Sequence, residues 1–267
     1  MIRRAWFPLL LGAALAVTLA FLVLPVIAIF THTSPGELIS KLGDPAATEA
    51  LRLSFETTAI AILVIVVVGT PAAYLLATRS FRGRFVVITL VELPIVLPPA
   101  VAGIALLAAL GPNGILGGAL ADAHIQLVLQ TAGVVVALTF VSAPFYLRQA
   151  QSSFQAVDRS VVEAARTLGS SEAASFARVS IPVALPGLLA GLALAWARAL
   201  GEFGATLMFA GSFRGITQTV PLAIYDQFAT DFPAALALSA ILVAVSAGLL
   251  LAVKLIPGQA ALGGAAR

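Results

Sequence analysis

Six apolar segments, each about long enough to cross a bilayer, constrain the fold of this chain more than any other feature. Within the hydrocarbon core only helices and closed barrels satisfy all of their backbone hydrogen bonds, and a spanning helix needs about 20 apolar residues. Only 10% of the residues are charged and 60% are hydrophobic. We therefore predict an all-α integral membrane protein, a single transmembrane domain over residues 1–267, with spans at roughly 8–30, 56–78, 85–110, 126–147, 183–210 and 233–256.

Positive charge is distributed unevenly between the loops that join these segments. With a cytoplasmic N-terminus, eleven of the 15 Lys and Arg residues lie on the cytoplasmic side, three on the outer side and one within a span. Cytoplasmic loops of membrane proteins carry an excess of Lys and Arg. We therefore predict that both termini are cytoplasmic and that the polar stretch at residues 161–182 lies on the same side.

Several kinds of chemistry are excluded by residues that the chain lacks. It has no cysteine, which removes disulfides and thiolate metal sites. Neither of its two lysines follows a glycine, so a phosphate-binding loop of the G-x-x-x-x-G-K-[ST] type is absent. His32 and His124 fall in predicted outer loops without metal-ligand spacing. We expect no metal site, no cofactor and no enzyme activity in this chain. Because no basic face is concentrated, we also expect no nucleic-acid partner.

The polar stretch VVEAARTLGSSEAASFARVSIP interrupts the second half of this apolar chain. Ala164 and Ala165 favour a helix, and Gly169 offers a stop. Ser170 is placed to cap a second helix, whose early Glu172 suits the positive end of the helix dipole. The pattern predicts a helix, a glycine turn and a second helix below the membrane. Such a segment either docks another protein or is an amphipathic surface loop.

The same stretch resembles the EAA loop of the permease subunits of ATP-binding-cassette importers, here residues 158–182. The match is E-A-A at 163–165, glycine at 169 and V-x-I-P at 179–182; valine and isoleucine stand where the family pattern has isoleucine and leucine. In that family the loop forms coupling helices that insert into a cytoplasmic ATPase subunit. The resemblance implies that the ATPase-coupling residues here are Glu163, Ala164, Ala165, Gly169 and Pro182, the last at the expected start of the fifth span.

Further stretches narrow the resemblance to the molybdate permease subunit, over residues of about 49–256. They are EALRLSFETT, ELPIVLPPAVAGIALLAALG, RALGEFGATLMFAG and TQTVPLAIYDQF. The resemblance implies the type I ABC importer permease fold in a prokaryotic plasma (inner) membrane, importing molybdate. It also implies a homodimer working with an ATPase dimer, which holds ATP and magnesium, and with an extracytoplasmic oxyanion-binding protein. Sulfate and tungstate permeases have overlapping motifs and stay open as alternatives.

Four residues within predicted spans are candidates for the translocation pathway: Glu92, Arg198, Glu202 and Thr206. A charge near the bilayer centre costs about 2.5–3.5 kcal/mol on insertion scales, so the three charged residues are expected to face protein or water. Arg198 and Glu202 are four residues apart and can pair. That pair either fixes the fifth helix or supplies positive potential to a weakly held oxyanion. Glu92 either belongs to an inner gate or hydrogen-bonds backbone freed by Pro94.

An ion-coupled secondary transporter or a channel would share this composition. It would also share the helices that prolines are expected to bend, among them the third predicted span with Pro94, Pro98 and Pro99. Such a protein needs no ATPase and usually carries ionisable residues near the midplane. The EAA loop favours the importer permease instead.

Overall fold

The computed structural model describes residues 6–32, 36, 40 and 43–254, and within these ranges it is helical with no strand. Five helices are long and apolar enough to cross a membrane, and a bent pair supplies a sixth candidate span. The predicted all-α membrane fold is therefore confirmed. The elements are α1 (Trp6–Thr31), α3 (Pro45–Thr78), α4 (Arg84–Val96), α5 (Pro99–Leu110), α6 (Gly117–Asp122), α7 (Thr131–Gln155), α8 (Arg159–Thr167), α9 (Glu172–Ser175), the π-helical turn η2 (Phe176–Ser180), α10 (Ile181–Leu200), α11 (Gly204–Ala210), α12 (Val220–Phe228) and α13 (Phe232–Lys254).

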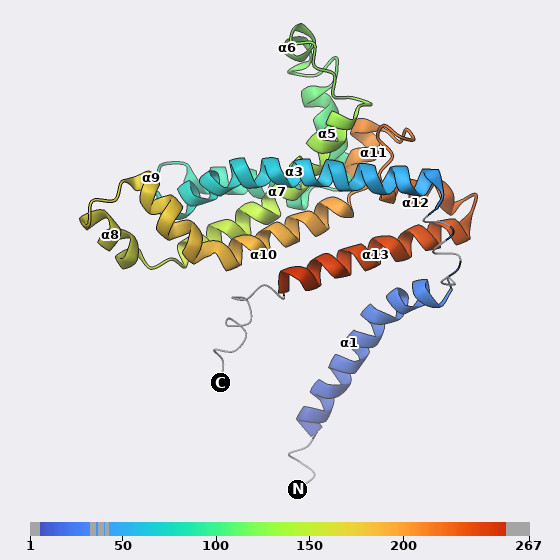
Figure 1. Ribbon diagram of the computed structural model, residues 1–267, viewed down its shortest axis with the longest axis horizontal. Helices are drawn as coiled ribbons and strands as arrows, with labels where there is room; N and C mark the ends of the chain where they lie inside the picture. The colour runs from blue at the N-terminus through green and yellow to red at the C-terminus, as the bar shows by residue number, and fades with distance from the viewer. Residues whose placement is uncertain (1–5, 33–35, 37–39, 41–42, 255–267) are drawn as a thin grey trace.

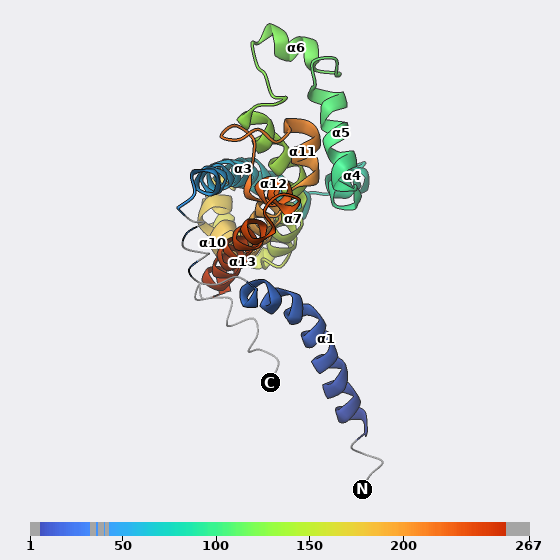
Figure 2. The ribbon, with the colours of Figure 1, turned by 90° about the vertical axis from the view of Figure 1, so that its right-hand side faces the viewer.

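Helices α3, α7 and α10 form the centre of the molecule, with α13 running alongside α10 (Figure 1). The α8–α9 segment lies beyond one end of this bundle and α12 lies at the opposite end. Helix α1 diverges from the bundle, and α5 and α6 project from another side of it, as the two views show (Figure 2). The predicted cytoplasmic loop and the predicted last outer loop are thus at opposite ends.

Helix α3 begins eleven residues before the predicted span and is 34 residues long. Asp44 accepts a hydrogen bond from the backbone N–H of Ala46 at 2.9 Å, and Pro45 occupies the first turn, where its missing N–H costs nothing. At 1.5 Å per residue the helix is about 50 Å long, so it extends beyond the hydrocarbon core. The apolar run predicted only its membrane part, because the capping signal lies in polar sequence.

The third predicted span, 85–110, is broken rather than merely bent. Helices α4 and α5 meet at 119° across Leu97 and Pro98. Pro98 and Pro99 supply no backbone N–H, and Pro98 also disfavours helical geometry at Leu97. The proline density that indicated a bent span therefore ends one helix and begins another.

The fifth predicted span, 183–210, is wrong at both ends. A continuous helical run extends from Glu172 to Leu200, passing through η2 and Pro182. The π-helical turn shifts the backbone hydrogen-bond pattern just before the proline, so the helix does not restart at Pro182 as the sequence suggested. After Leu200 the helix stops, and Thr206 lies in the separate helix α11.

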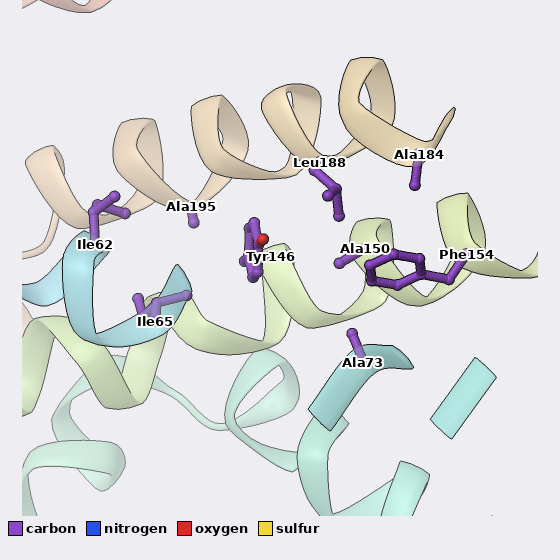
Figure 3. Packing of buried hydrophobic residues seen from close by; sticks show 9 residues of the cluster. All are labelled: Ile62, Ile65, Ala73, Tyr146, Ala150, Phe154, Ala184, Leu188 and Ala195. Carbon is purple, nitrogen blue, oxygen red and sulfur yellow. The ribbon is translucent and has the colours of Figure 1, made fainter. Parts of the chain in front are cut away.

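Small residues allow the central helices to approach closely. Tyr146 of α7 is almost fully buried among residues of α3 and α10 (Figure 3), and its hydroxyl is 2.6 Å from Oγ1 of Thr70. A Cβ at Gly187 of α10 would overlap the side chain of Ser153 on α7, and one at Gly191 would lie 3.0 Å from Cβ of Gln149. This glycine pair therefore serves packing within the chain.

We predict that Gly187→Val destabilises the protein, because the added side chain forces α10 away from α7. Overpacking of this kind costs about 1–3 kcal/mol, which should lower the midpoint of thermal unfolding in detergent. Gly248→Val is the matched control, since nothing lies within 4 Å of a Cβ at that position in α13. Equal midpoints for the two variants would contradict the close α7–α10 contact.

Candidate functional site

The predicted coupling loop consists of two capped helices joined by a glycine. Asp158 caps α8 by accepting a hydrogen bond from the backbone N–H of Ser160 at 2.9 Å, and this bond lowers the pKa of the Asp158 carboxyl. Gly169 follows α8 with φ +91°, a conformation that glycine adopts without strain. The second helix is capped by Ser171, whose Oγ accepts from the N–H of Ala174 at 3.2 Å. The sequence prediction placed this cap one residue early, at Ser170.

The structure brings most of the predicted coupling residues together at the surface. Glu163 and Ala164 are exposed on α8, Ala165 is half-buried, and Gly169 is exposed in the turn that follows. Pro182 is also exposed but belongs to α10. Glu163, Ala164 and the glycine are therefore exposed and Ala165 is partly covered, whereas Pro182 belongs to the helix that the loop leads into.

Arg79, at the end of α3, is a member of this site that sequence reasoning missed. It forms an ion pair with Glu172 of α9, and Arg166 of α8 also approaches Glu172, with Nη2 3.5 Å from Oε1. All three side chains are about half exposed. Because Arg79 is 93 residues from Glu172 in sequence, no local pattern could reveal the contact. The pairs tie both loop helices to the end of α3.

An aromatic cluster joins the loop to the bundle. The rings of Tyr74 on α3 and Phe176 in η2 have centroids 4.6 Å apart, and Phe154 near the end of α7 is 5.3 Å from Tyr74 and 6.1 Å from Phe176. Three elements thus meet directly beneath α8 and α9. Aromatic contacts at these distances are favourable beyond the area that they bury, so the loop is packed onto the bundle rather than only tethered to it.

The Arg198–Glu202 pair forms as the sequence predicted. Nη1 of Arg198 lies 2.6 Å from Oε2 of Glu202, whose side chain is only 1% exposed. The other carboxylate oxygen of Glu202 accepts a hydrogen bond from the backbone N–H of Ala205 at 2.7 Å. Glu202 therefore joins the end of α10 to the first turn of α11. This second contact was not predicted, because the break between the two helices was not.

Glu92 has a partner that neither sequence hypothesis named. Its Oε1 lies 2.6 Å from Nη1 of Arg148 on α7, so the carboxylate is paired with an arginine rather than with backbone freed by Pro94. The two side chains are 35% and 54% exposed. A half-exposed ion pair within apolar helices is costly against lipid, which indicates that this face of α4 and α7 meets water or protein.

Thr206, the fourth pathway candidate, is fully buried in α11. Its hydroxyl has no hydrogen-bond partner among the described residues. Helix α11 packs against α5 and α7, so Thr206 lies among helices, on the element that Glu202 caps. The four candidates are therefore divided: Arg198, Glu202 and Thr206 surround the α10–α11 junction, whereas Glu92 belongs to the separate α4–α7 contact.

At the opposite end of the bundle, Ser54 of α3 caps the first turn of α12, which has no cap from its own preceding residue. Its Oγ accepts a hydrogen bond from the backbone N–H of Val220 at 2.8 Å, and the residue preceding α12 makes no side-chain cap. Ser54 is buried within α3. Two of the motifs that carried the resemblance, EALRLSFETT and TQTVPLAIYDQF, are therefore in contact.

In the part of the chain that the structure describes, no group of three or more metal-ligating side chains occurs.

We predict that Glu202→Ala is more destabilising than Glu202→Gln. An amide oxygen can still accept the Ala205 N–H, whereas alanine leaves that donor and Arg198 without their partner. Loss of a hydrogen bond to a charged group costs about 1.5–3 kcal/mol. Thermal unfolding in detergent should rank wild type above Gln and Gln above Ala. If Ala and Gln unfold together, Glu202 does not cap α11.

Comparison with known proteins identifies the family of this chain. Residues 69–258, more than half of the chain, match the model of the binding-protein-dependent transport system inner membrane component. The molybdenum transport system permease protein ModB of Mycobacterium tuberculosis is 43% identical over 237 residues, which are 88% of this chain and 89% of ModB. The sulfate transport system permease protein CysW of Synechocystis is 34% identical over 223 residues, 82% of this chain and 81% of CysW.

A solved structure shares the fold. It is a bacterial alginate ABC transporter in complex with an alginate pentasaccharide-bound periplasmic protein; the similarity has a TM-score of 0.76 at 15% identity and covers 95% of this chain and 94% of that one. The predicted type I importer permease fold and the membrane location are confirmed, and a channel or ion-coupled transporter is excluded. The chain belongs to the family of binding-protein-dependent transport system inner membrane components, and it is a permease subunit of an ABC importer, not itself an enzyme.

Proposed function

We propose that this permease subunit imports molybdate. The observation that carries the proposal is the 43% identity to a molybdenum permease over nearly the whole chain, against 34% to a sulfate permease over a somewhat shorter match. A relative named for molybdate and tungstate together also matches, at 34% identity. Tungstate is therefore the second candidate, because it has the same charge and tetrahedral shape as molybdate, and sulfate is the third.

The EAA loop is the proposed docking site for a cytoplasmic ATPase. Its support is the exposure of Glu163 and Ala164 on a short, capped helix at the end of the bundle where the positive-inside rule places the cytoplasm. The aromatic cluster and the ion pairs of Glu172 connect that helix to α3 and α7. Movement of the docked ATPase would therefore reach the central helices through direct contacts.

The permease works as a homodimer in this proposal, with an ATPase dimer on the cytoplasmic side and an oxyanion-binding protein outside. Two features support a partner within the membrane. No residue of α1 or α4 is buried in the single chain, and the half-exposed pair of Glu92 and Arg148 lies on α4 and α7. A second copy would shelter this pair from lipid and enclose a pathway along the dimer axis.

Arg198 contributes positive potential along the proposed pathway, and Glu202 limits how tightly an anion is held. The pair also has the structural role of capping α11. Glu92 and Arg148 lie on the cytoplasmic half and act as an inner gate, closed while the pair is intact. The pathway role of Arg198 is rejected if Arg198→Gln leaves both complex assembly and molybdate uptake unchanged.

The first test of the function is ATP-dependent uptake of molybdate into vesicles that contain this chain, its ATPase and its binding protein. Tungstate should compete at equal concentration and sulfate should not, because sulfate is a smaller anion. Suppression by equimolar sulfate would transfer the assignment to sulfate, and the absence of any ATP-dependent oxyanion uptake would reject the proposal.

We predict that Glu163→Arg abolishes ATP-driven uptake while the protein still inserts and folds. Reversing an exposed charge on α8 leaves the packing of the bundle intact but places a like charge or a clash at the docking surface. The matched control is Asp122→Arg, the same change on the exposed end of α6. The measurements are uptake and retention of the ATPase on the purified permease. Normal values for Glu163→Arg would remove the loop from docking.

A further inference from the structure

A cleft of about 480 Å³ lies between the coupling helices and the ends of α3 and α7. It is lined by side chains from every element that meets there. Arg79 comes from the end of α3, and Arg159 and Arg166 come from α8; Glu163 and Glu172 also line it, and Ser180 comes from η2. The cleft is on the inner side of the loop, so it is distinct from the α10–α11 junction that holds Arg198 and Glu202.

The charges around the cleft do not cancel. Three arginines face two carboxylates, and one of these carboxylates, Glu172, is shared between Arg79 and Arg166. Within residues 43–254 Arg159 makes no ion pair, and neither does Glu163, although the two are four residues apart on α8. The cleft therefore has a positive excess, and Arg159 has its guanidinium donors available.

Ser180 gives the cleft a polar atom that requires a partner. The residue is 1% exposed, and its Oγ makes no hydrogen bond to any described residue. A buried hydroxyl without a partner loses the hydrogen bonds that it made to water in the unfolded chain. Ser180 lines the cleft, and rotation of its side chain toward the cleft would let a bound group accept the Ser180 O–H.

We propose that this cleft binds a tetrahedral oxyanion, either a free anion or the phosphate of an anionic lipid headgroup. Guanidinium groups form charge-assisted hydrogen bonds with such oxygens, and Arg159, Arg166 and the Ser180 hydroxyl supply donors from two elements. Basic pockets at the cytoplasmic ends of membrane helices bind lipid phosphates by the same chemistry. Occupancy would join α8 to η2, in addition to the contacts made by Glu172. The site does not depend on which ion the permease carries.

The probe is inorganic phosphate, which has the required shape and is not a proposed cargo. Its binding to the full-length permease is measured by calorimetry in phosphatidylcholine nanodiscs at low ionic strength, where screening is weak. We expect Arg159→Gln to weaken binding about tenfold and Ser180→Ala about threefold. Glu163→Gln should strengthen it, because it removes a like charge. Arg82→Gln, which changes an exposed arginine outside the cleft, should leave it unchanged.

Repeating the measurement in nanodiscs of a different lipid distinguishes the two sources of the oxyanion. The anionic surface of phosphatidylglycerol nanodiscs repels phosphate from every variant, so the wild type is compared with Arg159→Gln in each lipid. If the natural ligand is a headgroup, phosphatidylglycerol should reduce phosphate affinity several-fold more for the wild type than for Arg159→Gln. If it is a free anion, both affinities should fall by the same factor. Arg159→Lys keeps the charge and should bind within about threefold of the wild type. The site is rejected if phosphate does not bind, if Arg82→Gln weakens binding as much as Arg159→Gln, or if Arg159→Lys loses binding fully.

Discussion

The packing of α7 between α3 and α10 is the contact on which the other parts of the structure depend. Tyr146 lies at its centre, bonded to Thr70 and faced by Gly69 and Gly191. In a membrane such an interface gains little from the hydrophobic effect, because lipid is as apolar as the side chains it would replace. Close backbone approach and interhelical hydrogen bonds hold it together instead. Helices α5 and α11 then pack on α7, and the coupling loop packs on the ends of α3 and α7.

The lipid around the helices also constrains where charged side chains can lie. The three charged pathway candidates each have a partner of opposite sign: Glu92 with Arg148, and Arg198 with Glu202. The two pairs differ in exposure, since Glu202 is buried and also caps α11, whereas Glu92 and Arg148 are open to their surroundings. A structural role is therefore strongest for Glu202, and a role at a water-filled surface is strongest for Glu92 and Arg148.

Local sequence predicted the helical class, five of the apolar spans in outline, and the helix–glycine–helix form of the loop. These features depend on hydropathy, capping residues and Gly169, all of which are visible within a few residues. It predicted the Arg198–Glu202 pair because the spacing is one helical turn. It could not predict the pairing of Arg79 with Glu172, of Arg148 with Glu92 or of Ser54 with α12, because these depend on how distant helices pack. It also missed the continuation of the helix through Pro182, because a π-helical turn has no clear signature in composition.

The uninterrupted helical run from Glu172 to Leu200 has a mechanical consequence. It is 29 residues long, which corresponds to roughly 40 Å, and it begins in the loop and ends two residues before the carboxylate that caps α11. Such a run behaves as a lever whose fulcrum is the glycine-mediated contact with α7. A tilt of about 10° about that contact would move the loop end, roughly 25 Å away, by about 4 Å, and the opposite end, roughly 17 Å away, by about 3 Å in the other direction. A rotation imposed at the loop end is therefore transmitted, reversed in direction and somewhat reduced, to the residues just before the carboxylate that caps α11.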